Sequence, residues 1–237
     1  MARLVLVRHA QSVANRDSVG LGRTDSPLTD LGQRQAAALG AALARQPIDR
    51  IITSPLQRAQ STAQAIEAAQ PRAPAGPLPI DVDDRLIEMD VGELDGLPWL
   101  LVQERYGEFV QRWLSDDASE TKMPGGESLA EVARRAWPVV EPLIDPSDGH
   151  ADGQTGVEQA CTVVVSHNFV LRTLVCRVLG LQLNRWRSFE LDLASRSTVE
   201  RVRGRPVLVD LNETSHLAAE LHIVNAPRSG RALSRER

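Results

Sequence analysis

Residues 3–9 read Arg-Leu-Val-Leu-Val-Arg-His, and this stretch decides the fold class. An unbroken run of leucine and valine is typical of a β-strand that is covered on both faces. Residues 162–166, Thr-Val-Val-Val-Ser, predict a second strand of this type. Arg8 and His9 come at the end of the first predicted strand, and His167 directly follows the second. The two histidines therefore have equivalent positions in two strand-to-helix units.

The segments that follow the first strand alternate between helical and extended patterns. Thr29–Arg45 is rich in alanine and predicts a helix, and Arg50–Thr53 predicts a short strand. Ser54-Pro55-Leu56-Gln57 has the form of a helix start, with serine as the N-cap and proline at the first helical position. This start would place Arg58 in the first turn of its helix. Ile80–Asp84 predicts another strand.

Such alternation predicts an α/β fold, a three-layer sandwich in which helices cover both faces of a mostly parallel central sheet. Sheets of this kind bind ligands beyond the C-terminal ends of their strands. Arg8, His9, Arg58 and His167 are the candidates for that edge. A ligand site is therefore expected where these four side chains meet.

We expect one domain over residues 1–225, since the chain is long enough for a single sizeable core. Between about residues 89 and 126 the alternation is lost, and an inserted cap over the C-terminal strand edge is expected there. This segment holds four of the chain's few aromatic residues, Trp99, Tyr106, Phe109 and Trp113. They are expected either to form the cap's own small core or to shape an apolar pocket, with the core role for most of them.

The second half of the chain predicts a helix that starts at the capping box Ser128–Glu131. Pro138 and Pro142 should kink or interrupt this helix after Trp137. Further expectations are a polar surface loop over 145–159, a closing pair of strands over 197–202 and 206–211, and a flexible tail over 226–237.

Composition excludes several classes of protein. A net charge of −4 gives no overall reason to bind nucleic acid or a membrane surface. The sequence has no apolar run of about 18 residues, so neither secretion nor membrane spanning is predicted. Cys161 and Cys176 fit no CxxC spacing and no disulfide framework, which indicates a reducing compartment and hence the cytoplasm.

The pair Arg8-His9 combines a cation with a group that can act as a nucleophile. Alone, such a pair is more often a salt bridge or a histidine with ordinary hydrogen bonds. His167 at the equivalent position changes this balance, because one neutral imidazole can attack phosphorus while its partner donates a hydrogen bond to the phosphoryl oxygens. Both histidines could instead bind a metal, with Glu88 as the third ligand. A metal site would not need the neighbouring arginines.

Motifs along nearly the whole chain carry a resemblance to a known family. They are, in order, Leu6–Ser12 with Asn15; Asp25–Thr29 with Gly32 and Gln35-Ala36; Thr53–Pro55 with Arg58-Ala59 and Thr62-Ala63; Leu86, Glu88, Gly92 and Asp95-Gly96; Pro124–Ser128; Ser166-His167; and Leu211-Asn212 with Thr214 and His216-Leu217. In this order and spacing the sequence resembles the histidine phosphatase superfamily, in its phosphoglycerate mutase-like branch.

The resemblance implies roles for five residues. It implies that His9 is phosphorylated and that Arg8, Arg58 and His167 hold the phosphoryl group. Glu88 corresponds to the proton donor and acceptor, although from the residues alone it reads as a surface carboxylate paired with Arg85. The resemblance implies neither a metal nor a cofactor.

Further contacts to the phosphate or substrate are expected from Ser12, Asn15, Arg23 and Asn168. Arg23 could meet a second anionic group, or it could be solvated only. Asn168 stands where many relatives have glycine, so it would take a left-handed backbone conformation or add a phosphate contact. Ala10 also replaces a commoner glycine, which is tolerable if the backbone there does not need positive φ.

The segment from Glu88 to Gly96 and the shortness of the expected cap look more like a phosphatase than a mutase. We therefore expect a metal-independent phosphoric-monoester hydrolase that acts on a small phosphorylated metabolite through a phosphohistidine. The alternatives are a 2,3-bisphosphoglycerate-dependent phosphoglycerate mutase and a catalytically silent relative that binds phosphate. The sequence leaves the oligomeric state open, and a homodimer is compatible with it.

Overall fold

A computed structural model describes residues 3–71, 76–144 and 161–222 of the chain. The strands are β1 (Arg3–Arg8), β2 (Arg50–Thr53), β3 (Ile80–Val82), β4 (Cys161–Ser166), β5 (Arg196–Val202) and β6 (Arg205–Glu213). The α-helices are α1 (Val13–Arg16), α2 (Asp30–Leu43), α3 (Gln57–Ala69), α4 (Trp99–Arg105), α5 (Gly107–Leu114), α6 (Leu129–Ile144) and α7 (Asn168–Val178). The short 3₁₀ helices are η1 (Asp84–Leu86), η2 (Gly92–Leu94), η3 (Asp116–Ser119), η4 (Leu183–Arg187) and η5 (Ala219–Leu221).

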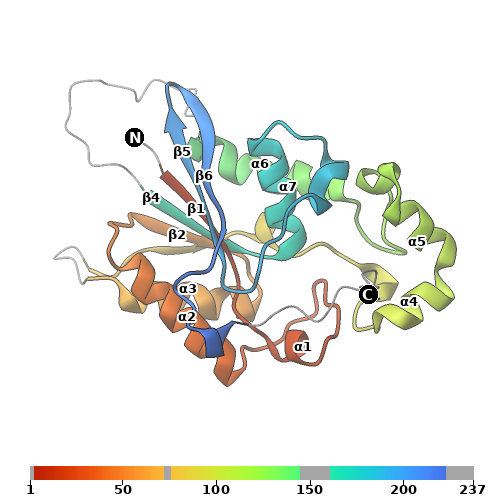
Figure 1. Cartoon of the computed structure of the whole chain (residues 1–237), viewed down its shortest axis with the longest axis horizontal. Coiled ribbons are helices and arrows are strands. Elements are labelled where there is room, and N and C mark those ends of the chain that lie inside the picture. Colours follow the sequence, from red (N-terminus) through yellow and green to blue (C-terminus); the bar gives the residue numbers. More distant parts are fainter. Residues whose placement is uncertain (1–2, 72–75, 145–160, 223–237) are drawn as a thin grey trace, which may run out of the picture.

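The described strands form one sheet in the order β3-β2-β4-β1-β5-β6. The first four of these are parallel to one another, whereas β5 pairs antiparallel with β1 and β6 pairs antiparallel with β5. Helices α2 and α3 cover one face of the sheet, and α6 and α7 cover the other (Figure 1). This arrangement confirms the predicted three-layer sandwich with a mostly parallel sheet.

Alternate residues of β1 are buried on opposite faces, as the unbroken apolar run predicts. Val5 and Val7 pack into the core beneath α2 and α3. Leu4 and Leu6 pack into a larger core with α6 and α7. Both faces are covered, so β1 and its parallel neighbour β4 lie at the centre of the molecule.

Helix α6 runs without interruption through Pro138 and Pro142 to Ile144, so the expected interruption after Trp137 is wrong. Both prolines are exposed, and they lie four residues apart on the solvent face. The carbonyl groups that lose an N–H partner there can bond to water. The buried face, from Leu129 onward, holds the helix against the sheet. The predicted capping box is present, because the Ser128 hydroxyl accepts from the N–H of Glu131 and the Glu131 carboxylate accepts from the N–H of Ser128.

The closing strands are confirmed as the antiparallel pair β5 and β6. Arg203 and Gly204 between them have φ of 51° and 80°, the conformation of a tight hairpin turn. The loop expected over 145–159 and the tail expected over 226–237 lie outside the described residues.

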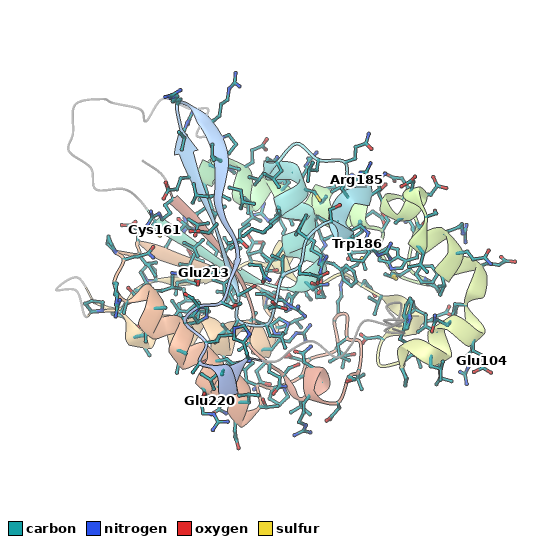
Figure 2. All side chains as sticks on the ribbon, viewed as in Figure 1. Glu104, Cys161, Arg185, Trp186, Glu213 and Glu220 are labelled. Carbon is teal, nitrogen blue, oxygen red and sulfur yellow. The ribbon has the colours of Figure 1, made fainter. Side chains whose placement is uncertain are left out.

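Helices α4 and α5 lie beyond the C-terminal ends of the parallel strands (Figure 1). Aromatic rings join them to the rest of the protein: the Trp113 ring is 5.9 Å from that of Phe169 and 5.3 Å from that of Trp186, between centroids. Figure 2 shows Trp186 between α7 and these helices. Phe109 and Trp113 are buried as core residues, whereas Trp99 remains 37% exposed.

Candidate active site

His9 and His167 lie next to each other at the C-terminal ends of β1 and β4. The parallel register pairs Arg8 with Ser166, so the next residue of each strand leaves the sheet at the same place. The backbone N–H of His9 donates to the carbonyl of Ser166 over 3.0 Å, and the two imidazole centroids are 5.0 Å apart. Both rings are buried. The structure therefore brings the two predicted histidines together.

Hydrogen bonds fix the tautomer of His9. Its Nδ1 lies 2.7 Å from the carbonyl oxygen of Ala10, so Nδ1 carries the proton and Nε2 keeps a free lone pair. The N–H of Ala10 in turn donates to the hydroxyl of Thr62 over 3.1 Å. Burial, then the nearby charges of Arg58 and Arg8, hold the pKa of His9 well below its usual range. The ring is therefore neutral at neutral pH, and its Nε2 has the lone pair that a nucleophile needs. Ala10 has no positive φ, which explains why alanine is tolerated there.

His167 has the opposite tautomer. Its Nδ1 accepts from Nε–H of Arg58 over 3.3 Å, so Nε2 carries the proton and donates to the Ser54 hydroxyl over 2.7 Å. Burial, then the charges of its neighbours, hold the pKa of His167 well below its usual range. The predicted N-cap role of Ser54 is wrong, because α3 begins at Gln57 with Leu56 as its N-cap. Ser54 instead faces His167.

Arg58 is buried near the start of α3, as predicted. It donates to the carbonyls of Thr24 and Gly22, each over 2.9 Å, in addition to His167. Burial lowers the pKa of this guanidinium. The helix N-terminus beside it is already occupied, since the N–H of Gln57 donates to both carboxylate oxygens of Asp25 at 3.0 Å. An incoming anion would therefore meet the Arg58 side chain, and the first N–H of the helix is not free for it.

Arg8 keeps unused hydrogen-bonding capacity. Its Nη1 donates to the carbonyl of Leu191 over 2.5 Å, while its buried Nε has no hydrogen-bond partner among the described residues. Burial lowers the pKa of Arg8 to about 10, so the side chain is still charged at neutral pH. A partly buried cation with a buried, unpaired donor gains strongly from a nearby anion.

Glu88 follows η1 and is 5% exposed. Its carboxylate accepts from the backbone N–H of Met89 over 2.8 Å and from that of Phe169 over 3.4 Å. Burial raises the pKa of Glu88, although Arg58 and Arg8 lie near enough to oppose the shift. The interpretation as a surface carboxylate is wrong, because Arg85 pairs with Asp83 at 2.7 Å instead.

Arg135 of α6 holds the backbone that carries Glu88, and it is not among the residues predicted from the sequence. Its guanidinium donates to the carbonyls of Arg85, Ile87 and Glu88 over 2.7 to 3.2 Å. The carboxylate of Glu127 fixes the guanidinium from the other side over 2.9 Å. The only sequence signal for this contact is the motif Pro124–Ser128, which contains Glu127.

The remaining predicted residues have partners within the protein. Ser12 and Asn15 form a capping box with each other at the start of α1. Arg23 pairs with Asp90 at 3.3 Å and with Glu127 at 3.2 Å, so it is not simply solvated. Their expected contacts to phosphate or substrate stay predictions.

Asn168 is the first residue of α7, and it does not take the left-handed conformation. Its side-chain oxygen accepts from Arg172 over 3.0 Å. A contact from this side chain to phosphate stays a prediction.

Within residues 3–71, 76–144 and 161–222, no group of three or more His, Cys, Asp and Glu side chains is arranged to hold a metal ion. Over the same ranges, each helix is too short or too polar to cross a lipid bilayer.

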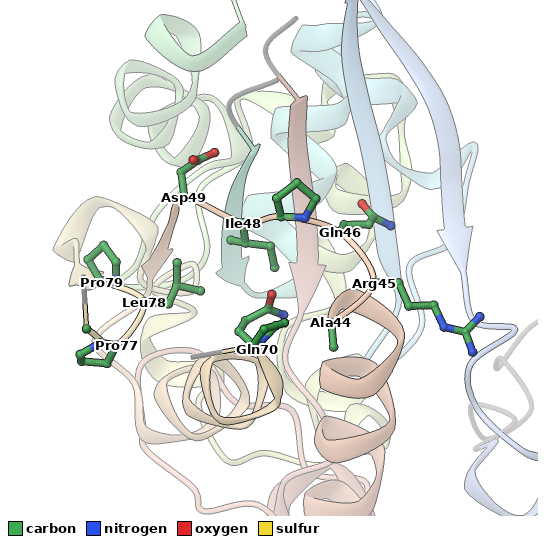
Figure 3. A pocket seen from close by; sticks show the side chains of 12 residues that line it. Ala44, Arg45, Gln46, Ile48, Asp49, Gln70, Pro77, Leu78 and Pro79 are labelled. Carbon is green, nitrogen blue, oxygen red and sulfur yellow. The ribbon is translucent and has the colours of Figure 1, made fainter. Parts of the chain in front are cut away.

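A hollow of about 770 Å³ lies away from these residues, between the α2–β2 loop and the end of α3 (Figure 3). Ile48, Asp49 and Leu78 line it, near the N-terminal ends of β2 and β3. Because ligands of such sheets bind at the opposite edge, this hollow is not the candidate active site.

Comparison with known proteins identifies one family. Residues 4–214 match the family model of the histidine phosphatase superfamily (branch 1). Phosphoserine phosphatase 1 of Hydrogenobacter thermophilus is 36% identical over 217 residues, which cover 92% of this chain and 95% of that protein. A probable phosphoglycerate mutase of Yersinia enterocolitica is 32% identical over 203 residues, covering 84% and 85%. The mycobacterial glucosyl-3-phosphoglycerate phosphatase structure has a TM-score of 0.75 at 28% identity, covering 89% and 98%.

The fold, the paired histidines and these matches define the class: the chain belongs to the histidine phosphatase superfamily. The resemblance expected from the motifs is confirmed. Its relatives include named phosphatases of small phosphorylated metabolites and a named mutase.

Proposed function

We propose that the chain is a metal-independent phosphoric-monoester hydrolase that acts on a small phosphorylated metabolite through a phosphohistidine at His9. The observation that carries this proposal is the free Nε2 of a neutral, buried His9 beside Arg8, Arg58 and a second histidine. The similarity to named phosphatases supports the hydrolase over other reactions.

In the first step the lone pair of His9 Nε2 attacks phosphorus, and the bond from phosphorus to the ester oxygen breaks. Glu88, whose raised pKa favours the protonated form, gives its proton to the departing oxygen. Arg8 offers its unpaired donor to the phosphoryl oxygens. Arg58 reaches them when one of its carbonyl contacts is exchanged for a phosphoryl oxygen. Charge that develops on these oxygens is thereby stabilised.

In the second step the ionised Glu88 takes a proton from water, and the water oxygen attacks phosphorus. The bond from phosphorus to His9 Nε2 breaks, and its electron pair returns to the imidazole. Inorganic phosphate leaves, and Glu88 is protonated again. If each charge-assisted hydrogen bond contributes about 1.5 to 3 kcal/mol, losing Arg8 or Arg58 should lower the rate by roughly one to two decades.

The proposal is tested by incubating the protein with p-nitrophenyl phosphate, 3-phosphoglycerate, a sugar phosphate and α-ribazole phosphate in the presence of EDTA. We expect release of phosphate by the wild-type protein and none by His9→Ala. The matched control is His222→Ala, which changes an exposed histidine and should release phosphate like the wild type.

Other outcomes would point to the alternatives. Conversion of 3-phosphoglycerate to 2-phosphoglycerate that depends on 2,3-bisphosphoglycerate, without net phosphate release, would show a mutase. Stoichiometric phosphate binding without turnover would show a silent relative. Loss of activity in EDTA would show that a metal takes part. We place the proposed reaction in the cytoplasm, because both cysteines are free and buried.

A further inference from the structure

A second cavity, of about 290 Å³, lies under α4 and α5 and is separate from the hollow described above. Its lining comes from the loop after α1, from the segment after Glu88, from both helices and from the start of α7. The residues are Ser18, Gly20, Leu21, Val91, Leu94, Leu97, Trp99, Val102, Phe109, Trp113, Met123 and Phe169. The volume is near the lower end of the range for small-molecule sites.

One residue, Phe169, both lines this cavity and contacts the carboxylate of Glu88. Phe169 donates its backbone N–H to that carboxylate, and Phe169 also lines the cavity, with its ring 5.9 Å from that of Trp113. Leu21, which also lines the cavity, directly precedes Gly22, whose carbonyl accepts from Arg58. The lining of the cavity is therefore linked to Glu88 and to Arg58 of the candidate active site.

The chemistry of the first step places the leaving group on this side. Glu88 can protonate only an ester oxygen that lies close to it, so the alcohol part of the substrate must extend from His9 toward Glu88. A chain that continues in this direction enters the cavity between α4, α5 and α7.

The lining is mainly apolar. Among the described lining residues, Ser18 has a hydroxyl group and Trp99 and Trp113 have indole N–H groups, but none of them is charged. The two cations nearest to this loop in sequence are already paired, Arg16 with Asp17 and Arg23 with Asp90 and Glu127. A substrate carboxylate or ammonium group in the cavity would lose its water without gaining a partner of opposite charge, which is unfavourable.

We infer that the alcohol part of the substrate is an apolar group, such as a medium-length alkyl chain or an aromatic ring, that binds in this cavity. This inference rests on the proposed function of the site. It separates the chain from enzymes that select a phosphorylated amino acid or a phosphorylated sugar acid.

The test compares kcat/KM of the full chain for ethyl, butyl and hexyl phosphate, whose leaving groups are chemically alike, with phosphoserine and 3-phosphoglycerate. Each buried methylene should raise kcat/KM roughly fourfold, so hexyl phosphate should exceed ethyl phosphate by about two decades. Phosphoserine and 3-phosphoglycerate should fall near ethyl phosphate.

Two neighbouring residues of α4 provide matched variants. Trp99 lines the cavity, whereas Leu100 is 75% exposed and does not. Trp99→Ser should lower kcat/KM for hexyl phosphate about tenfold and leave ethyl phosphate unchanged. Leu100→Ser should change neither value.

Three results would overturn the inference without contradicting the proposed phosphatase function. They are equal kcat/KM values along the alkyl series, a preference for phosphoserine or 3-phosphoglycerate, and equal effects of the two variants. Failure to hydrolyse any of the esters, p-nitrophenyl phosphate included, would instead contradict the proposed function.

Discussion

At the scale of single residues, hydrogen bonds leave one ring nitrogen free in His9 but engage both ring nitrogens of the neighbouring His167. His9 donates from Nδ1 to its neighbour Ala10, which leaves Nε2 free. Both nitrogens of His167 are engaged, one by Arg58 and one by Ser54. The bonding of the His9 ring therefore supports the proposed role of His9 as the nucleophile, as the family motif does.

The raised pKa of Glu88 predicts the pH dependence of the first step. Its carboxyl group stays protonated above the usual range for glutamate, and kcat/KM should fall as the pH rises through the raised value, because the ionised form cannot donate a proton. Glu88→Gln should lower kcat/KM for an alkyl phosphate by about 10² to 10⁴ and remove this alkaline limb. The measurement is a pH profile of kcat/KM for both proteins.

The matched control is Glu93→Gln, which changes an exposed carboxylate that accepts a hydrogen bond from Tyr106. Its profile should match that of the wild type. An unchanged alkaline limb in Glu88→Gln would show that another group donates the proton.

Loss of the Ser54 hydroxyl should have a smaller effect on kcat. Removing its hydroxyl leaves the N–H of His167 Nε2 without an acceptor in a buried position, so the imidazole would lose its fixed orientation. Ser54→Ala should lower kcat about tenfold, whereas Ser188→Ala, at an exposed serine, should have no effect. Steady-state kinetics with p-nitrophenyl phosphate measures both, and equal kcat values would contradict the role given to Ser54.

At the scale of elements, close packing of α2 holds the loop that follows His9. The hydroxyl of Thr29 caps α2 by accepting from the N–H of Gly32 over 3.0 Å, and the N–H of Thr29 donates to the carbonyl of Gln11 over 3.0 Å. A β-carbon added to Gly32 would collide with that same carbonyl. The helix can approach the loop only because this residue is glycine.

This packing predicts that Gly32→Ala destabilises the folded protein. The clash should displace α2 and lower the free energy of unfolding by about 1 to 3 kcal/mol, despite the better helix propensity of alanine. Gly107 in α5 is a matched position, because nothing lies near its added β-carbon. Gly107→Ala should leave stability unchanged or raise it by about 0.5 to 1 kcal/mol. Urea denaturation of both variants checks this, and similar effects would contradict the packing argument.

At the scale of the whole molecule, burial of two neutral histidines makes stability depend on pH. The folded pKa values of His9 and His167 lie below their ordinary value of 6.5, so the unfolded chain binds protons more readily. Their contribution to stability is complete above pH 6.5 and is lost as the pH falls below it. Urea denaturation should therefore show lower stability at pH 5.5 than at pH 7.5.

The variants His9→Gln and His167→Gln should each reduce this difference, while His222→Gln, at an exposed position, should not. The opposite trend, with stability rising as the pH falls through this range, would mean that both rings are protonated in the folded protein.

The overall architecture and the four central residues could be predicted because each depends on local sequence. Apolar runs define β1 and β4, and parallel strands bring the residues after them to one edge. The hydrogen bond from His167 to Ser54 could not be predicted, since it joins residues 113 positions apart and depends on the direction of a side chain. The same applies to Arg135, which reaches the backbone of Glu88 from a helix 47 residues further along.

The continuity of α6 through Pro138 could not be predicted from the sequence either, because proline is ordinarily a helix breaker. A helix with a large buried face can nevertheless keep an exposed proline. The charge state of Glu88 depends on burial, which its immediate neighbours do not reveal.

The central claim is that His9 accepts the phosphoryl group. The most direct test mixes the protein rapidly with p-nitrophenyl phosphate, stops the reaction at alkaline pH, where phosphohistidine is stable, and locates the phosphoryl group by mass spectrometry of peptides. We predict an added phosphoryl group on the peptide that contains His9, lost on acid treatment and absent from His9→Ala. Turnover with no phosphorylated intermediate, or with the phosphoryl group on another residue, would contradict the account.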